Sequence, residues 1–311
     1  GSGRASGGDR KITAGYQLVL RRFGAGRKVR IRMEKKGMAP LWLKYPQIPN
    51  GSIGWRMGYG EAYGDKFYGW FHTLDSDGQK EYNRKFPQPV CWSLSEYNLM
   101  RHNTFWTYQW HRNSGPPYTL EKLQEERENG CVREIVFFWG HHPGKEEKTG
   151  KECFSQWYQA AFHVGHLSYC CMEQYLMSGK ARLFGDEETN REIMDATSPS
   201  EIKQLGRRVK GFDEAVWERF RLPIALTGNY YKFSQLKSLR TCLLATGDCI
   251  LAEASPDDRI WGIGMDQNEA AGTDSSQWRG RNLLGFALME VRDEIRRLRR
   301  YEDEVDFGDA E

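Results

Sequence analysis

The chain has 311 residues and a mass of 36.1 kDa, which is enough for one large domain or two ordinary ones. Lys and Arg number 45 against 42 Asp and Glu, and the resulting net charge of +3 excludes a uniformly basic nucleic-acid-binding coat but allows a local basic groove. No apolar run approaches the roughly 20 residues that a membrane helix needs, and residues 1–15 are predicted to be a disordered tail or tag.

Residues 16–118 form an aromatic-rich region that holds six of the 11 tryptophans and contains no catalytic motif that we recognise. The alternation in 28–33 and the aromatic piece 68–72 predict strands, and turns are predicted at 49–52 and 114–117. The rings fit two interpretations, a packed core or a platform on which nucleic-acid bases stack. The region is either an appended domain or an elaboration packed onto the rest.

Residues 119–301 are predicted to be mainly helical and to form a second unit of the chain. Ser198, Pro199 and Glu201 have the spacing of an N-cap, a first helical position and a capping box. The tail 302–311 is acidic and is expected to fray. The fold class is therefore predicted to be α+β, predominantly helical with a small sheet. The expected helices are 118–129, 170–184, a helix from 199, 212–220, 233–246 and 282–301, and the expected strands are 131–139 and 250–254.

Seven cysteines, an odd number without a C-x-x-C pair, indicate reduced thiols in an intracellular compartment, cytoplasmic or nuclear. His163 and His166 have metal-like spacing, but no third ligand stands near them in the sequence. We therefore expect neither a metal site nor a redox cofactor.

Glu173 and Lys180 lie seven residues apart in the predicted helix 170–184 and so share one face within about 20°. This spacing misses the i,i+4 ion pair, so each charge needs another partner, and a ligand held between them would serve. Two solvated surface charges are the simpler interpretation. The apolar neighbours of the two residues weigh against it, because they leave little of this helix for solvent.

Two further segments carry candidate binding groups. After the predicted strand 250–254, a Pro-Asp turn projects Asp258 and Trp261, and Gly262 and Gly264 allow close backbone approach or positive φ. Trp261 fits a core position equally well. Before the last helix, Asn282 is a plausible N-cap.

The start of that last helix also fits an anion site. Free N–H groups at a helix start suit a diphosphate, and Arg279 and Arg281 add charge-assisted donors. A capped helix with a purely structural role is the alternative.

In order and spacing, the motifs of the second half resemble those of the NADAR family, also called YbiA-like, over about residues 131–300. Two departures stand out: the family's usual Ser-Asn appears as Ser155-Gln156, and the stretch 265–277 is longer than usual. The matching motifs are FFW at 137–139, FSQWY from 154, MEQYLMSGKARLFGD from 172, SPSEIKQLGRRVKGFD from 198, Trp217, Lys232-Phe233, CLLATGD from 242, SPDDRIWGIG from 255 and WRGRNLLGFALMEVRDE from 278.

The resemblance implies that residues 119–301 form a catalytic domain with an N-glycosidase fold that binds a ribosyl phosphate or ADP-ribose. The resemblance implies one of two activities. One is removal of ADP-ribose from the amino group of guanine in DNA or RNA, and the other is cleavage of ribosylamino-pyrimidine phosphates of riboflavin synthesis. Both break a bond from ribose C1 to nitrogen. The aromatic, locally basic first half favours the nucleic acid, since a small metabolite needs no such surface. A module that binds ADP-ribose or NAD without turnover is a third interpretation.

The resemblance also assigns roles. Lys180 would attack C1 and form a Schiff base, or would act only electrostatically while Glu173 activates water. Asp258 would bind ribose or orient Lys180, and Trp261 would stack on a base. Asn282 and the start of the last helix would bind the phosphates. The substrate-binding set implied in this way is Ser155, Arg207, Trp261, Gly262, Gly264, Arg281 and Asn282.

Overall fold

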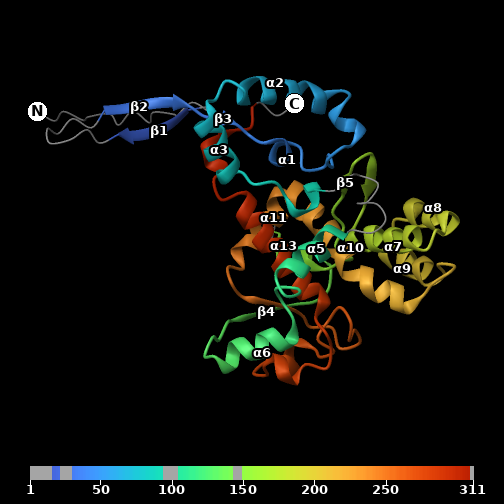
Figure 1. The fold of residues 1–311 in the computed structure, drawn as a ribbon. Coiled ribbons are helices and arrows are strands. Elements are labelled where there is room, and N and C mark those ends of the chain that lie inside the picture. Colours follow the sequence, from blue (N-terminus) through green and yellow to red (C-terminus); the bar gives the residue numbers. More distant parts are fainter. Residues whose placement is uncertain (1–15, 22–29, 94–103, 143–148, 309–311) are drawn as a thin grey trace, which may run out of the picture.

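A computed structural model describes residues 16–21, 30–93, 104–142 and 149–308. Its fold is α+β, as predicted (Figure 1). The helices are α1 Leu41–Lys44, α2 Tyr59–Phe71, α3 Ser76–Lys85, α5 Thr104–Arg112, α6 Leu120–Glu128, α7 Met172–Leu183, α8 Glu187–Asp195, α9 Pro199–Arg207, α10 Glu214–Gln235, α11 Lys237–Ala245, α12 Gln267–Ala270 and α13 Leu283–Leu298. The 3₁₀ turns are Ile53–Trp55, Val90–Ser93, Lys151–Phe154, Ser275–Gln277 and Glu302–Glu304.

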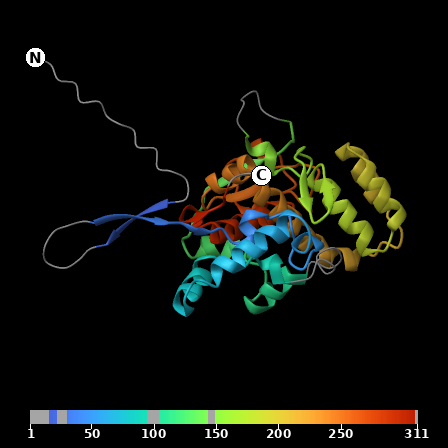
Figure 2. The same ribbon diagram turned by 90° about the horizontal axis from the view of Figure 1, so that it is seen from above.

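The described strands pair in twos rather than in one larger sheet. β1 (Tyr16–Arg21) runs antiparallel to β2 (Arg30–Lys35), and β5 (Phe162–Val164) runs antiparallel to β6 (Leu167–Tyr169). β3 (Gly37–Met38) is parallel to β8 (Val305–Asp306), and β4 (Ile135–Phe138) is parallel to β7 (Ile250–Glu253). The β1–β2 hairpin projects from the body of the molecule, on the side opposite α8 and α9 (Figures 1 and 2).

The aromatic region packs onto the remainder of the chain through one shared hydrophobic core. Trp42, Trp92 and Trp106 are buried in the same cluster as α7, α10 and α13 side chains, which confirms the core interpretation of these rings. The indole of Trp106 also donates to Thr227 at 3.2 Å. Among the helices that the structure describes, none is long and apolar enough to cross a bilayer.

The structure confirms several sequence predictions at places where local residues fix the ends of a helix or its buried face. Helix α6 begins after Thr119, whose hydroxyl accepts from the N–H of Lys122, and ends at a glycine with positive φ, Gly130. Helix α7 likewise stops before Gly185 (φ 71°). The α13 stripe of apolar residues is buried, as its 3.6-residue spacing predicts.

Other predictions are wrong. Residues 68–71 belong to helix α2, because Tyr63 and Phe67 recur at helical spacing and bury one face. The predicted strand 131–139 is reduced to β4, which pairs with β7 alone among the strands that the structure describes. The predicted capping box is not formed, since the Ser198 side chain makes no cap hydrogen bond, although Pro199 does open α9.

Helix α10 is the largest departure from the sequence prediction. Proline normally breaks a helix because it lacks an N–H and crowds the preceding turn. Here the helix continues through Pro223 to Gln235, and every residue from 223 to 234 is buried. Burial on all sides therefore overrides the local signal. The expected acidic tail is partly ordered too, because Val305 and Asp306 form β8 beside β3.

Candidate active site

Three carboxyl groups from two parts of the chain share one electrostatic neighbourhood. Glu173 lies in the first turn of α7 and is 5% exposed, Glu253 is the last residue of β7, and Asp258 follows in the next loop. The charges of Asp258 and Glu173 both raise the pKa of Glu253, and Asp258 raises the pKa of Glu173. We call these three residues the acidic cluster.

Burial changes the acidity of Glu173. Loss of solvent is the largest effect and raises its pKa from 4.5 to about 7. The positive charge of Lys203, a hydrogen bond donated by Trp157 and the charge of Arg207 each favour the ionised form and limit that rise. Glu173 therefore exchanges its proton near neutral pH, which is the property that a general acid or base needs.

Glu253 is perturbed in the same direction. Burial, followed by the charge of Asp258, raises its pKa from 4.5 to about 8. Its Oε2 is buried and has no hydrogen-bond partner among the residues that the structure describes. A buried carboxyl oxygen without a partner is rare, because desolvation without compensation is costly.

Asn282 positions Glu253 rather than a phosphate. Its side chain is fully buried, its Nδ2 donates to the carbonyl of Leu251 at 2.8 Å, and its Oδ1 accepts from the backbone N–H of Glu253 at 3.1 Å. The residue occupies the predicted N-cap position of α13 with a left-handed φ of 53°, but its side chain makes no cap hydrogen bond. The predicted phosphate-binding role of Asn282 is therefore wrong, since both ends of its amide already bind β7.

The backbone N–H groups at the start of α13 are also hydrogen-bonded within the protein. The N–H groups of Leu283 and Leu284 donate to the carbonyls of Ile260 and Trp261 at 3.2 and 3.1 Å. Arg281 pairs with Glu218 at 2.5 Å. These contacts correct the expectation of an open anion site at this helix start.

The loop after β7 is held tightly. Asp258 accepts from the N–H groups of Ile260 and Trp261 at 2.9 and 2.7 Å, which fixes the turn. Gly262 leaves no room for a side chain, since a Cβ there would lie 2.9 Å from the carbonyl oxygen of Glu253, and Gly264 has a φ of +68°. Both predicted properties of these glycines are confirmed, and they serve packing. The ring of Trp261 is half-buried against the core.

Lys180 faces helix α9, as does Glu173. Its Nζ donates to the carbonyl of Gly206 at 2.9 Å and lies 4.1 Å from the ring centre of Phe212. Burial lowers its pKa, and Glu214 opposes that effect. Both α7 side chains therefore interact with α9, Glu173 electrostatically with Lys203 and Arg207 and Lys180 by its hydrogen bond to Gly206. Among the described interactions, Glu173 and Lys180 do not contact each other.

A tryptophan links the acidic cluster to a small pocket. Trp157 donates to Glu173, and the ammonium of Lys203 lies 5.5 Å from its ring centre. On another side, the His141 ring centre is 5.5 Å away, and His141 lines a pocket of about 300 Å³. Ser155 is buried just before this segment, and its hydroxyl accepts from the N–H of Trp157 at 3.2 Å.

Sequence reasoning missed four residues of this region: Glu253, Trp157, Lys203 and Trp139. Glu253 had a usable signal, a lone acid at the exit of a buried strand. Trp139 directly follows Phe138, the last residue of β4, which pairs with Glu253. The Trp139 residue is 64% exposed. Its exposure depends on tertiary packing and has no local signature. Within the described residues, no group of three or more His, Cys, Asp or Glu is arranged to hold a metal ion.

Comparisons with known proteins place this region. Residues 137–296 match the NADAR domain. The chain is also 40% identical over 164 residues to "N-glycosidase R617" of Acanthamoeba polyphaga mimivirus, which covers 51% of this chain and 95% of that protein. The chain belongs to the NADAR family. Its NADAR segment contains the whole acidic cluster and Lys180.

Two further similarities concern the same segment. A maize protein named "Riboflavin biosynthesis protein PYRR, chloroplastic" is 38% identical over 109 residues, which is 34% of this chain and 16% of that protein. The solved NMR structure of E. coli YbiA is 26% identical and covers 52% of this chain and 85% of that one, with a TM-score of 0.42.

Proposed function

We propose that this NADAR protein is an N-glycosidase that removes ADP-ribose from guanine bases of DNA or RNA. The observation that carries the proposal is a pair of glutamates, buried Glu173 and half-buried Glu253, whose pKa values rise to about 7 and about 8. Between those values one carboxyl of such a pair is protonated and the other is ionised. Hydrolysis of a glycosidic bond requires an acid for the leaving group and a base for water.

The reaction balances with these two groups alone. As the C1–N bond breaks, its electron pair goes to the guanine nitrogen, which takes the proton of the carboxylic acid. Water then adds its oxygen to ribose C1 and gives a proton to the carboxylate. The products are free ADP-ribose and the unmodified guanine amine. The buried setting strengthens the stabilisation that a carboxylate gives to the positive charge developing at C1.

Neighbouring residues suit a substrate that carries phosphates. Lys203 and Arg207 place positive charge beside Glu173, and Arg207 is exposed to solvent. We assign these two cations to the diphosphate of ADP-ribose. Trp139, exposed beyond β4, and Trp261 are the candidate rings for stacking on a base.

A Schiff base on Lys180 is the second route, in which the amine attacks C1 of the opened sugar and expels the guanine amine. The lowering of the Lys180 pKa by burial favours it, whereas the Gly206 carbonyl and the Phe212 ring favour the charged form. Borohydride during turnover would reduce such an adduct and leave a stable mass increase on Lys180. An active enzyme that yields no adduct, and a Lys180→Met variant that keeps activity, would contradict this route.

The alternative substrates are ribosylamino-pyrimidine phosphates, favoured by the similarity to the maize riboflavin protein. Both substrate classes are incubated with the protein and with Glu173→Gln and Glu253→Gln, and release of free ADP-ribose or free pyrimidine is followed by chromatography. We expect ADP-ribose from the modified guanine and at least a hundredfold loss in either variant, in line with the usual contribution of a general acid or base, roughly 10²–10⁴-fold. Binding of ADP-ribose without any release would instead identify a binding module.

A further inference from the structure

Two of the seven cysteines meet where the 3₁₀ turn Lys151–Phe154 packs against helix α11. Cys153, in the turn, is fully buried, and Cys242, in the helix, is partly exposed. The carbonyl oxygen of Gly150 accepts from the Cys153 backbone N–H at 3.2 Å and from the Cys242 thiol at 3.5 Å, which holds the two residues together. The Cys153 thiol also donates to the Cys242 sulfur. We call these two cysteines the thiol pair, and the proposed glycosidase reaction does not use them.

The two thiols differ in acidity and in access. The hydrogen bond donated by Cys153 lowers the pKa of Cys242 and raises the pKa of Cys153, so Cys242 is the thiol that ionises first. Cys242 is also the one that solvent reaches. A partly exposed thiolate is the form of cysteine that peroxides oxidise, and a second thiol beside it converts the product to a disulfide. The thiol pair therefore has the arrangement of an attacking and a resolving cysteine.

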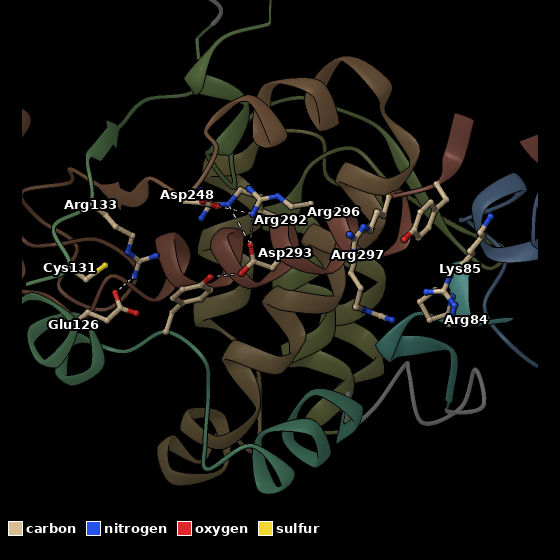
Figure 3. Close-up of a pocket in the computed structure, with 14 residues that line it drawn as sticks. Arg84, Lys85, Glu126, Cys131, Arg133, Asp248, Arg292, Asp293, Arg296 and Arg297 are labelled. Carbon is tan, nitrogen blue, oxygen red and sulfur yellow. Dashed lines mark hydrogen bonds and ion pairs between the residues drawn. The ribbon is translucent and has the colours of Figure 1, made fainter. Parts of the chain in front are cut away.

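Two other places in the chain carry thiols without this arrangement. The sulfur atoms of Cys170 and Cys171 are 3.8 Å apart, but neighbouring Cα atoms are only about 3.8 Å apart, whereas a disulfide usually joins Cα atoms roughly 4.4–6.8 Å apart. Cys131 is exposed and lines a groove of about 940 Å³, where Figure 3 shows it near Arg133 and with no second thiol among the residues drawn. These two places serve as controls for the thiol pair.

The turn that contains Cys153 leads into the segment that supports Glu173. Three residues after Cys153, the carbonyl of Gln156 accepts from the N–H of Glu173 at 2.8 Å. The next residue, Trp157, donates to the Glu173 carboxyl. The backbone and a side chain of one short segment therefore hold the glutamate, and a displacement of that segment changes both the position and the environment of its carboxyl.

A buried lysine transmits the position of Cys153 to this segment. Lys232 of α10 is fully buried, and its ammonium donates to the carbonyl of Cys153 at 2.6 Å and to the carbonyl of Ser155 at 3.2 Å. Loss of either bond would leave a buried charge with fewer partners, which is costly, so the backbone from 153 to 155 is held as a unit. A movement of Cys153 toward α11 therefore carries Ser155 and the residues after it along, and it strains the support of Glu173.

We propose that the thiol pair is an oxidative modification site, at which hydrogen peroxide forms a reversible disulfide that displaces the support of Glu173 and lowers glycosidase turnover. The loss of turnover rests on the proposed function, whereas the bond and the displacement do not. Bond formation draws the two sulfur atoms from hydrogen-bonding distance to about 2.05 Å and removes the Cys242 proton that is donated to Gly150. Both changes act on the turn that precedes Ser155.

The oxidation balances with hydrogen peroxide as the only co-reactant. The Cys242 thiolate attacks one peroxide oxygen, the O–O bond breaks, and Cys242 becomes a sulfenic acid while hydroxide leaves. The Cys153 sulfur then attacks the Cys242 sulfur, the new S–S bond replaces the S–O bond, and a second hydroxide leaves. The two thiol protons convert both hydroxides to water. The two sulfur atoms lose two electrons, the peroxide gains them, and a dithiol reductant reverses the step by exchange.

To test this, the full chain is oxidised with hydrogen peroxide, and half of each sample is then reduced with dithiothreitol. Peptide mass spectrometry locates disulfides, hydrogen exchange follows the peptide that contains Glu173, and chromatography follows release of ADP-ribose. The test variant is Cys242→Ser, whose hydroxyl still donates to Gly150 but cannot form the bond. The controls are Cys131→Ser and Cys170→Ser, and thermal unfolding checks that all three variants fold.

We expect the wild type and both controls to gain the Cys153–Cys242 bond. In these proteins, exchange at the Glu173 amide should become at least roughly tenfold faster, because the bond to Gln156 is strained. Turnover should fall at least roughly tenfold, since misplacing a catalytic group by about 1 Å can cost about a hundredfold. Dithiothreitol should restore both values. Cys242→Ser should keep its turnover and its exchange in peroxide.

Three results would overturn the proposal. The first is peroxide that oxidises other thiols but forms no Cys153–Cys242 bond. The second is a bond that leaves the exchange at Glu173 unchanged or leaves an active protein at full turnover. The third is an equal loss of turnover in Cys242→Ser, because the target would then be another group. If the reduced protein cleaves no substrate, the proposed function alone fails, and the exchange measurement still decides the proposal.

Discussion

Replacing Glu173 by Gln should make the protein more stable above neutral pH while removing its activity. In the folded state the Glu173 carboxyl has a pKa of about 7, whereas its ordinary pKa is 4.5. Below pH 4.5 the carboxyl is protonated in both the folded and the unfolded state, so its burial as a neutral group adds no ionisation penalty to the free energy of folding. As the pH rises from 4.5 to 7, only the unfolded chain gains the free energy of ionisation, so the wild type loses stability over that window.

The magnitude follows from the size of the shift. About 2.5 pKa units at roughly 1.36 kcal/mol each give about 3 kcal/mol, and the buried position needs no correction for solvent screening. Glutamine has nearly the same shape and retains an oxygen that accepts the Trp157 hydrogen bond. Glu173→Gln should therefore gain up to about 3 kcal/mol over the wild type at pH 8 and nothing at pH 4.5.

Urea unfolding of the wild type, Glu173→Gln and the exposed control Glu125→Gln, from pH 4.5 to 8.5, measures this difference. The control should follow the wild type within about 0.5 kcal/mol at every pH, as an exposed substitution usually does. A Glu173→Gln variant that is destabilised equally at pH 4.5 and pH 8 would refute the reasoning, because a carboxyl with an ordinary pKa carries no such penalty.

Three further substitutions test the geometry around the cluster. Asn282→Ala should cost about 2 kcal/mol of unfolding free energy, since it leaves buried groups of β7 unpaired, and should lower kcat by loosening Glu253; an unchanged urea midpoint would contradict this. Trp139→Ala should raise KM about tenfold at unchanged melting temperature if the exposed ring stacks on the base, and an unchanged KM would exclude that role. Gly285→Ala would place a Cβ 2.0 Å from the carbonyl oxygen of Leu251 and should cost about 3 kcal/mol, so a variant that unfolds like the wild type would show that the close packing of α13 on β7 is wrong.

The sequence predicts those elements whose ends carry their own signals. Helix α7 stops at a glycine with positive φ, β7 is a short apolar run, and α13 has a regular apolar stripe. Helix α10 is different, because its continuation through Pro223 depends on burial by neighbouring helices and not on local residues. The acidic sequence of the tail gives no sign of strand β8, because its pairing partner, β3, lies more than 260 residues earlier in the chain.

The site was predictable to the extent that its residues belong to recognisable motifs. Glu173 and Asp258 stand in such motifs and do share one electrostatic neighbourhood. The sequence shows Glu253 only as a lone acid at the exit of a strand, because its raised pKa comes from desolvation and from the charge of Asp258, which depend on the tertiary fold. Asn282 was assigned to phosphate because helix caps and anion sites share residue types, and only the contacts with β7 distinguish the two.

The pH dependence of kcat/KM for release of ADP-ribose from a modified guanine nucleotide tests the role of Glu173 and Glu253 most directly. With one acting as acid and the other as base, the rate should pass through a maximum between their pKa values of about 7 and about 8, falling on the alkaline side as the acid loses its proton. Glu173→Gln and Glu253→Gln should each abolish that maximum. A rate that stays flat from pH 5 to pH 9, and survives both substitutions, would place the chemistry elsewhere in the molecule.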